Sequence, residues 1–172
     1  YTTYRIQAMN PDATFIVTPA DAIILDEDVF VNDVANAGNF ASTNDALLTL
    51  GIKPTHPHTG YGYINFDENQ TANGVHKVHR FTEKPDLETA KGFLASGDYV
   101  WNAGIFIWSV KSVIAALAAN APNLYQKFED GKSNFNTANE IPFINKMYPT
   151  TPKISIDYAL MEKAENVYTV PA

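Results

Sequence analysis

"ATFIVTPAD" (residues 13–21) is a short, almost continuous apolar run that turns polar at its end. Such a run is typical of a strand covered on both faces in a parallel sheet. The next segment starts with acids and spaces Phe30, Val34 and Ala37 three or four positions apart, which predicts a helix. "NDALLTLGI" (residues 44–52) is a second buried strand. The order strand, helix, strand predicts an α/β fold with a mixed, mostly parallel sheet and flanking helices.

The rest of the chain continues this alternation of strands and helices. Strands are predicted at 59–66, 75–84, 99–109 and 167–172, and helices at 4–9, 86–96, 110–120, 122–130 and from Ser155 onward. Residues 131–153 are rich in Asn, Thr and Pro with weak periodicity, and they are predicted to be mostly loop. Because the chain opens on an apparent half-helix and closes on a strand, we interpret it as a piece of a larger domain.

Composition limits the class of protein. The 172 residues are 45% hydrophobic and 18% charged, as expected for one globular domain. No stretch approaches the ~18 unbroken apolar residues of a membrane span, and residues 1–20 lack the pattern of a secretory signal. The absence of cysteine excludes disulfides, thiolate metal sites and a thiol nucleophile, and it fits a cytoplasmic location.

The net charge of −7, from 12 basic and 19 acidic residues, bears on the ligand class. A nucleic-acid surface needs a basic stripe, which the 12 positive residues do not form, so nucleic acid is not expected as a partner. An anionic small ligand would need local donors, a divalent ion or backbone N–H groups to overcome the overall repulsion.

Asp21 is the first candidate site residue. It follows the strand at 13–21, and open α/β sheets bind ligands at the carboxyl ends of their strands. A carboxylate there can hold Mg²⁺, which prefers oxygen ligands and shares its coordination shell with phosphates. The alternative is an aspartate that caps a helix or makes a turn.

"RFTEKPD" (residues 80–86) places two opposite charges before a proline. Adjacent strand residues point to opposite faces, and Pro85 is expected to hold Lys84 in an extended conformation. One of the two side chains, Glu83 or Lys84, can then reach a sugar hydroxyl and the other a phosphate. The alternative is an exposed ion pair worth about 0–1 kcal/mol.

Asn102 interrupts an apolar run, and a buried amide without partners costs about 1–3 kcal/mol. Backbone groups of a bulge at Ala103 and Gly104 can satisfy it, and so can a ligand hydroxyl. Gly62 lies inside a predicted strand, where glycine is expected only if something approaches the backbone closely. Asp157 is predicted only to favour the start of its helix.

Several stretches together closely resemble the mannose-1-phosphate guanylyltransferases of the sugar-phosphate nucleotidyltransferase family. They are "PAD" at 19–21, "LLTLGIKPTHPHTGYGYI" at 47–64, "RFTEKPD" at 80–86, "FLASGDYVWNAGIFIW" at 93–108 and "SIDYALMEKAENVYTVPA" at 155–172. The resemblance implies a Rossmann-like nucleotide-diphospho-sugar transferase fold, truncated at both ends. Residues 1–172 would be the central and C-terminal part of one catalytic domain, lacking its N-terminal glycine-rich nucleotide loop.

The resemblance also implies a reaction, in which GTP and mannose 1-phosphate give GDP-mannose and pyrophosphate with Mg²⁺ as cofactor. Asp21 would help to hold Mg²⁺, and Lys84 would bind the sugar-linked phosphate. Gly62 would let the backbone approach the sugar, while Glu83 and Asn102 would hydrogen-bond its hydroxyls. These groups are expected to converge at the carboxyl edge of the sheet.

Two departures from the family pattern leave alternatives open. Ala22 stands where the family usually has His, and the family's second metal-binding aspartate would lie beyond Ala172. The alternatives are a nucleotidyltransferase for another hexose 1-phosphate and a non-catalytic, sugar-nucleotide-binding regulatory homologue. Strand edges left uncovered by the truncation are expected to favour a homodimer.

Overall fold

The computed structural model describes residues 1–172, except for the side chains of residues 69–72. Its strands are β1 (Thr14–Val17), β2 (Leu47–Ile52), β3 (Gly62–Ala72), β4 (Val75–Glu83), β5 (Tyr99–Ser109) and β6 (Val167–Pro171). Its helices are α1 (Thr2–Met9), α2 (Glu27–Thr43), α3 (Leu87–Ser96), α4 (Val110–Asn120), α5 (Pro122–Asp130) and α6 (Glu140–Met147). Short turns of helix are η1 (Lys132–Asn134), η2 (Tyr148–Thr150) and the π-helical η3 (Asp157–Met161).

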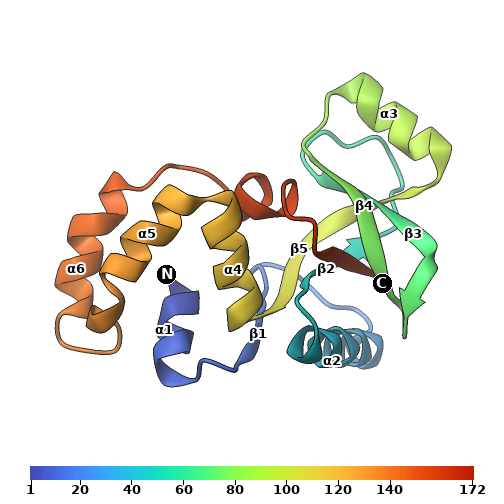
Figure 1. Ribbon diagram of the computed structural model, residues 1–172. Helices are drawn as coiled ribbons and strands as arrows, with labels where there is room; N and C mark the ends of the chain where they lie inside the picture. Colours follow the sequence, from blue (N-terminus) through green and yellow to red (C-terminus); the bar gives the residue numbers. More distant parts are fainter.

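One sheet runs through the molecule in the order β1-β5-β2-β6-β4-β3, and β3 also pairs with β5. The five strands from β5 to β3 therefore close on themselves as a barrel. Figure 1 shows α1, α4, α5 and α6 gathered at one end of the molecule, with α3, β3 and β4 at the other. Within the described residues, no helix is both long and apolar enough to cross a membrane.

The prediction of a mostly parallel sheet was wrong. Among the described pairings only β2 and β6 run parallel, and all the others are antiparallel. β1 and β2 do run in the same direction, but β5 lies between them and is antiparallel to both. The apolar run at 13–21 is also not buried on both faces as predicted, because β1 is an edge strand in which Ile16 and Val17 are about two-fifths exposed. An apolar run carries no information about the direction or number of a strand's neighbours.

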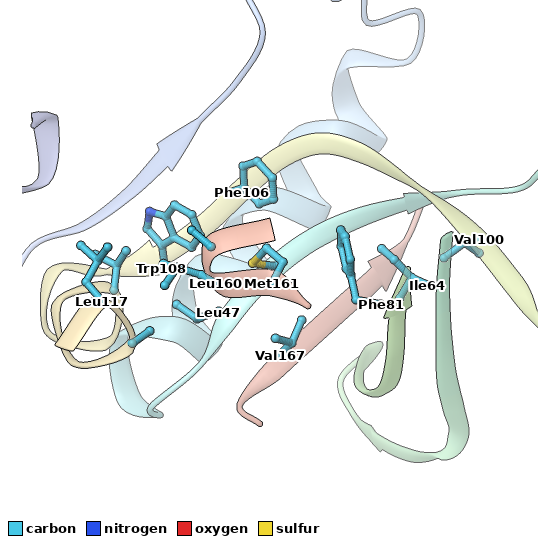
Figure 2. Packing of buried hydrophobic residues seen from close by; sticks show 13 residues of the cluster. Leu47, Ile64, Phe81, Val100, Phe106, Trp108, Leu117, Leu160, Met161 and Val167 are labelled. Atoms are coloured by element: carbon cyan, nitrogen blue, oxygen red, sulfur yellow. The ribbon is translucent and has the colours of Figure 1, made fainter. Parts of the chain in front are cut away.

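The sheet is covered on both faces, and β2 shows how. Leu47 packs into a cluster with Trp108, Leu160 and Val167, which Figure 2 shows in close-up. Leu48, the next residue, belongs to a second cluster that includes Ala37 and Ala41 of α2. Successive strand residues point to opposite faces, so burial of both leucines requires cover on both sides. The predicted α/β content with a doubly covered strand is thus confirmed at β2.

β5 and its two edges position the candidate site. One edge pairs with β2 along most of its length. The other edge is shared, because β1 pairs with residues 106–109 and β3 pairs with residues 99–101. Between these two ladders, residues 102–105 of β5 have no strand neighbour on that edge in the described pairings. We call this interval the β5 gap.

Two predicted elements near the C-terminus differ from the structure. The segment 131–153 was expected to be mostly loop, yet it contains α6. The helix expected from Ser155 is instead the five-residue η3, whose Ala159, Leu160 and Met161 are buried in the core. Three consecutive residues are therefore buried, whereas an amphipathic helix buries residues three or four positions apart.

Candidate functional site

Three predicted site residues meet beside the β5 gap. Gly62 begins β3 and pairs with Glu83, the last residue of β4. A Cβ atom added at Gly62 would lie 2.7 Å from Glu83 Oε2 and 3.2 Å from Asn102 Cβ. The close approach expected at Gly62 is therefore real, and the atoms that use it belong to Glu83 and Asn102. The place differs from the expected carboxyl edge, because it combines the start of one strand, the end of another and the interior of β5.

Asn102 is held on both ends of its amide. Its Oδ1 accepts hydrogen bonds from the hydroxyl of Thr49 at 2.7 Å and from the backbone N–H of Gly104 at 3.1 Å. Its Nδ2 donates to Oδ1 of Asp157 at 3.0 Å. Gly104 has φ +70, and the β2–β5 register shifts between Thr49 and Gly51, so the bulge allowed for in the sequence is present. The protein thus supplies partners to the amide without a ligand.

Glu83 is buried and only partly satisfied. Its side chain is 6% exposed, and Oε1 forms an ion pair with Lys84 Nζ at 2.8 Å. Oε2 has no hydrogen-bond donor among the described residues. Burial raises the pKa of Glu83, opposed by the hydrogen bond from Lys84, and the nearby charges of Asp157 and Glu162 raise it further. Glu83 Oε2 is thus a buried carboxylate oxygen that lacks a donor among the described residues.

Lys84 departs from its predicted conformation. It was expected to be extended before Pro85, but it has φ +48, in the left-handed region. This conformation lets the side chain fold back onto the carboxylate of its neighbour, where Glu83 raises the pKa of Lys84. The Lys84 side chain remains 51% exposed, so its ammonium is also available to an anion from solvent.

Sequence reasoning missed the contribution of η3. Asp157 does not cap its own turn, since no side-chain hydrogen bond caps η3, and instead it accepts from Asn102. Glu162, which follows the turn, accepts from the backbone N–H of Glu83 at 2.7 Å. Figure 1 shows η3 between α4 and β4. The signal that could have found Asp157 was the unsatisfied amide of Asn102, which required an acceptor somewhere in the chain.

Asp21 does not belong to the strands and the turn that carry Gly62, Glu83 and Asn102. It lies in an exposed turn after β1. It does not cap α2, because Asp26 does so by accepting from the backbone N–H of Val29. The segment comes near the β5 gap, since a Cβ atom added at Gly104 would lie 3.7 Å from Pro19 Cγ. Pro19 thus borders the β5 gap, and Asp21 and Ala22 come two and three residues after it in the chain.

The carboxylates of the described residues fit Mg²⁺ only where substrate phosphates supply the other ligands of the ion. Mg²⁺ is usually held by one or two carboxylates together with substrate phosphates. Asp21 offers one carboxylate, and in the part of the chain that the structure describes no group of three or more metal-ligating side chains occurs. This donor set fits an ion whose shell is completed by phosphates and does not fit a closed protein cage.

Sequence comparison identifies the family to which this fold and this site belong. Residues 4–146 match the nucleotidyl transferase family, and because the match covers most of the chain, the chain belongs to that family.

Relatives within the family include several bacterial proteins. The mannose-1-phosphate guanylyltransferase of Salmonella typhimurium is 37% identical over 165 residues, which cover 95% of this chain and 34% of that protein. The protein of the same name from Sinorhizobium fredii is 40% identical over 162 residues, 92% of this chain and 31% of the relative. A xanthan biosynthesis protein of Xanthomonas campestris is 38% identical over 93% of this chain and 34% of its own length. The resemblance found in the sequence is confirmed, and the chain spans about a third of the length of these relatives.

Two solved structures share the fold. One, described as mannose-1-phosphate geranyltransferase from Thermus thermophilus, superposes with a TM-score of 0.82 at 28% identity and covers 97% of this chain and 47% of that chain. The other, described as mannose-6-phosphate isomerase from Helicobacter pylori, has a TM-score of 0.79 at 27% identity, covering 98% and 65% of the two chains.

Proposed function

We propose that this chain forms the sugar-phosphate side of a nucleotidyltransferase that transfers GMP from GTP to mannose 1-phosphate. The products are GDP-mannose and pyrophosphate. The names of the relatives support the reaction class, and the site beside the β5 gap supports the location of the sugar.

One observation carries the proposal. Glu83 is a buried carboxylate with one oxygen lacking a donor, and it lies next to a half-exposed ammonium at an interruption of the sheet. A surface ion pair would leave both groups solvated and would contribute about 0–1 kcal/mol. A hexose 1-phosphate offers a hydroxyl to the oxygen of Glu83 that lacks a donor and a phosphate to Lys84, which is paired with Glu83 but half exposed.

The chemistry asks the protein mainly for positioning. A phosphate oxygen of mannose 1-phosphate, which is already anionic, attacks the α-phosphorus of GTP in line, a new O–P bond forms, and the bond to pyrophosphate breaks. No protein base is needed for this step. Lys84 would bind the attacking phosphate, and Glu83 and Asn102 would fix the hexose. Mg²⁺, with Asp21 as one ligand, would neutralise charge on the phosphates.

A substrate screen tests the proposal. The longer protein that carries this chain is assayed for pyrophosphate release with GTP, ATP and UTP, each combined with several hexose 1-phosphates. Preference for GTP and mannose 1-phosphate is expected. Preference for another hexose would keep the chemistry and change the substrate, whereas binding without turnover would favour the regulatory homologue, to which Ala22 in place of the usual His also points.

A further inference from the structure

We propose that Asp157 is a positioning residue, which fixes the amide of Asn102 in the orientation that serves the sugar. The inference rests on the proposed function, because Asn102 is the group through which Asp157 would act. Asp157 lies in η3, far in sequence from β5, and its carboxylate is 3.0 Å from Asn102 Nδ2.

The contacts of Asn102 define which way its amide faces. Oδ1 receives one hydrogen bond from the Thr49 hydroxyl and one from the Gly104 N–H. If the amide were reversed, its oxygen would face the carboxylate of Asp157, and an ionised carboxylate can only accept. The reversed amide would also turn its NH₂ group toward the N–H of Gly104. Asp157 and the N–H of Gly104 therefore both favour the same one of the two orientations.

The selected orientation leaves a donor for a ligand. A primary amide has two N–H donors, and in the described part of the chain Asn102 Nδ2 has one acceptor, Asp157. Both contacts of Oδ1 are with protein groups, one of them the fully buried Thr49. We assign the second N–H of Nδ2 to a sugar oxygen. Without Asp157, the N–H of Gly104 alone would oppose the reversed amide, because the Thr49 hydroxyl could accept from it while donating to the carbonyl oxygen of Ile105, 3.0 Å away.

The turn that carries Asp157 is anchored firmly enough for this role. Ala159, Leu160 and Met161 are at most 3% exposed and belong to the main core cluster. At its far end, Glu162 accepts from the backbone N–H of Glu83. One π-helical turn thus contacts both Asn102 and Glu83 and sets their spacing, and single π-helical turns frequently occur at functional sites.

A purely structural role explains less. Asp157 caps no helix, and its negative charge raises the pKa of the already buried Glu83. An uncharged acceptor would satisfy the Asn102 amide without this cost to the neighbouring carboxylate.

A double-mutant cycle on the 172-residue chain tests the inference, with mannose 1-phosphate binding measured by calorimetry. Asp157→Ala is expected to weaken binding about tenfold, the equivalent of one hydrogen bond. Asp157→Asn keeps an acceptor oxygen but adds a donor that can pair with the reversed amide, so it is expected to bind with an affinity between those of the wild type and Asp157→Ala. In the Asn102→Ala background, Asp157→Ala is expected to have no further effect. Asp28→Ala, which removes an exposed acid from α2, is the matched control.

Three results would overturn the role of Asp157 and leave the proposed function standing. They are wild-type affinity in Asp157→Ala, additive losses in the double variant, and equal losses in Asp157→Asn and Asp157→Ala. If the wild-type chain and the longer protein bind no hexose 1-phosphate, the proposed function fails and the inference fails with it. If Asp157→Ala does not fold, Thr49→Val replaces it in the cycle, since it removes the other side-chain anchor of the same amide. Additivity of Thr49→Val with Asn102→Ala would then count against positioning.

A second readout does not depend on the sugar. The side-chain NH₂ protons of Asn102 are expected to exchange with solvent slowly in the wild type and at least severalfold faster in Asp157→Ala. Unchanged exchange would show that Asp157 does not hold the amide.

Discussion

Glu83 binds its proton more tightly in the folded chain than in the unfolded chain, because it is buried and has one oxygen without a donor. Its pKa is raised above the ordinary value of 4.5, so the folded state carries more protons between that value and the raised one. The stability that this proton contributes is fully present below pH 4.5 and is lost as the pH rises through the folded pKa. At neutral pH the charged carboxylate therefore destabilises the fold.

Glu83→Gln is expected to separate stability from binding. At pH 7 the free energy of unfolding should rise by about 1 kcal/mol, or about 2–4 °C in Tm, because the burial cost of the charge disappears. The lost ion pair weighs less, since Lys84 is half exposed. At pH 4, where Glu83 holds a proton in both states, the two proteins should be equally stable.

Mannose 1-phosphate binding by the same variant should fall about tenfold or more, because a charged acceptor for a sugar hydroxyl is lost. Thermal melts at both pH values and calorimetry measure the two effects. A variant that loses stability and binding together would show that Glu83 serves the fold.

Gly62→Ala is expected to destabilise the chain by about 1–3 kcal/mol, because the new Cβ would lie 2.7 Å from Glu83 Oε2 and 3.2 Å from Phe81 Cζ. Gly92→Ala is the matched control, since a Cβ there has no neighbour within 4 Å and the residue lies inside α3. Alanine favours a helix over glycine by about 1 kcal/mol, so the control should be more stable than the wild type. Equal Tm values for the two variants would refute the close approach at Gly62.

At the scale of the element, β5 is interrupted by a bulge that supplies a hydrogen bond to the Asn102 amide. Gly104 donates its N–H to Asn102 from a backbone with φ +70, and β1 and β3 pair with β5 only on either side of this bulge. Gly104→Ala is expected to cost about 1–2 kcal/mol, because a Cβ is disfavoured in this conformation, although its contact with Pro19 Cγ at 3.7 Å would be an ordinary one. Urea unfolding measures this cost, and no change in the free energy of unfolding would mean that the bulge relaxes easily.

Local patterns predicted some elements to the residue. β5 and α4 occupy their predicted positions, because a continuous apolar run and a clear 3–4 spacing each specify one structure. α6 was missed since Pro142 and Asn145 hide its periodicity. Pro142 is tolerated because it lies in the first turn, where backbone N–H groups have no partner within the helix. Strand direction was wrong at β5 because pairing is decided by residues far apart in the chain.

The candidate site shows the same contrast between residues that local patterns reveal and residues that only distant contacts reveal. The family resemblance implied that Gly62, Glu83 and Asn102 converge. Two local signals pointed the same way, a glycine inside a predicted strand and an amide inside an apolar run. Asp157 obeys local rules as an acid near a turn, so only its contact with Asn102 reveals it. The place of Asp21 relative to the sugar site stays a prediction.

For the whole molecule, charge decides what 172 residues can do by themselves. The chain carries a net charge of −7, and among the described residues that form the site the cation is Lys84, which is already paired with Glu83. A hexose 1-phosphate brings about two negative charges and a nucleoside triphosphate about four more, and neutralising them is the main task of such a catalyst.

We therefore expect the 172-residue chain to bind mannose 1-phosphate weakly and to release no measurable pyrophosphate from GTP, even with Mg²⁺ present. Binding should weaken at least severalfold when the salt concentration rises from about 50 mM to 500 mM, because a half-exposed ammonium is screened by ions. Lys84→Gln should lose both the binding and its salt dependence, whereas Lys91→Gln, which removes an equally exposed lysine from α3, should change neither. Calorimetry and a pyrophosphate assay on the same preparations measure these outcomes. Turnover by the isolated chain would show that a single paired lysine suffices, and charge neutralisation by further groups would then be unnecessary.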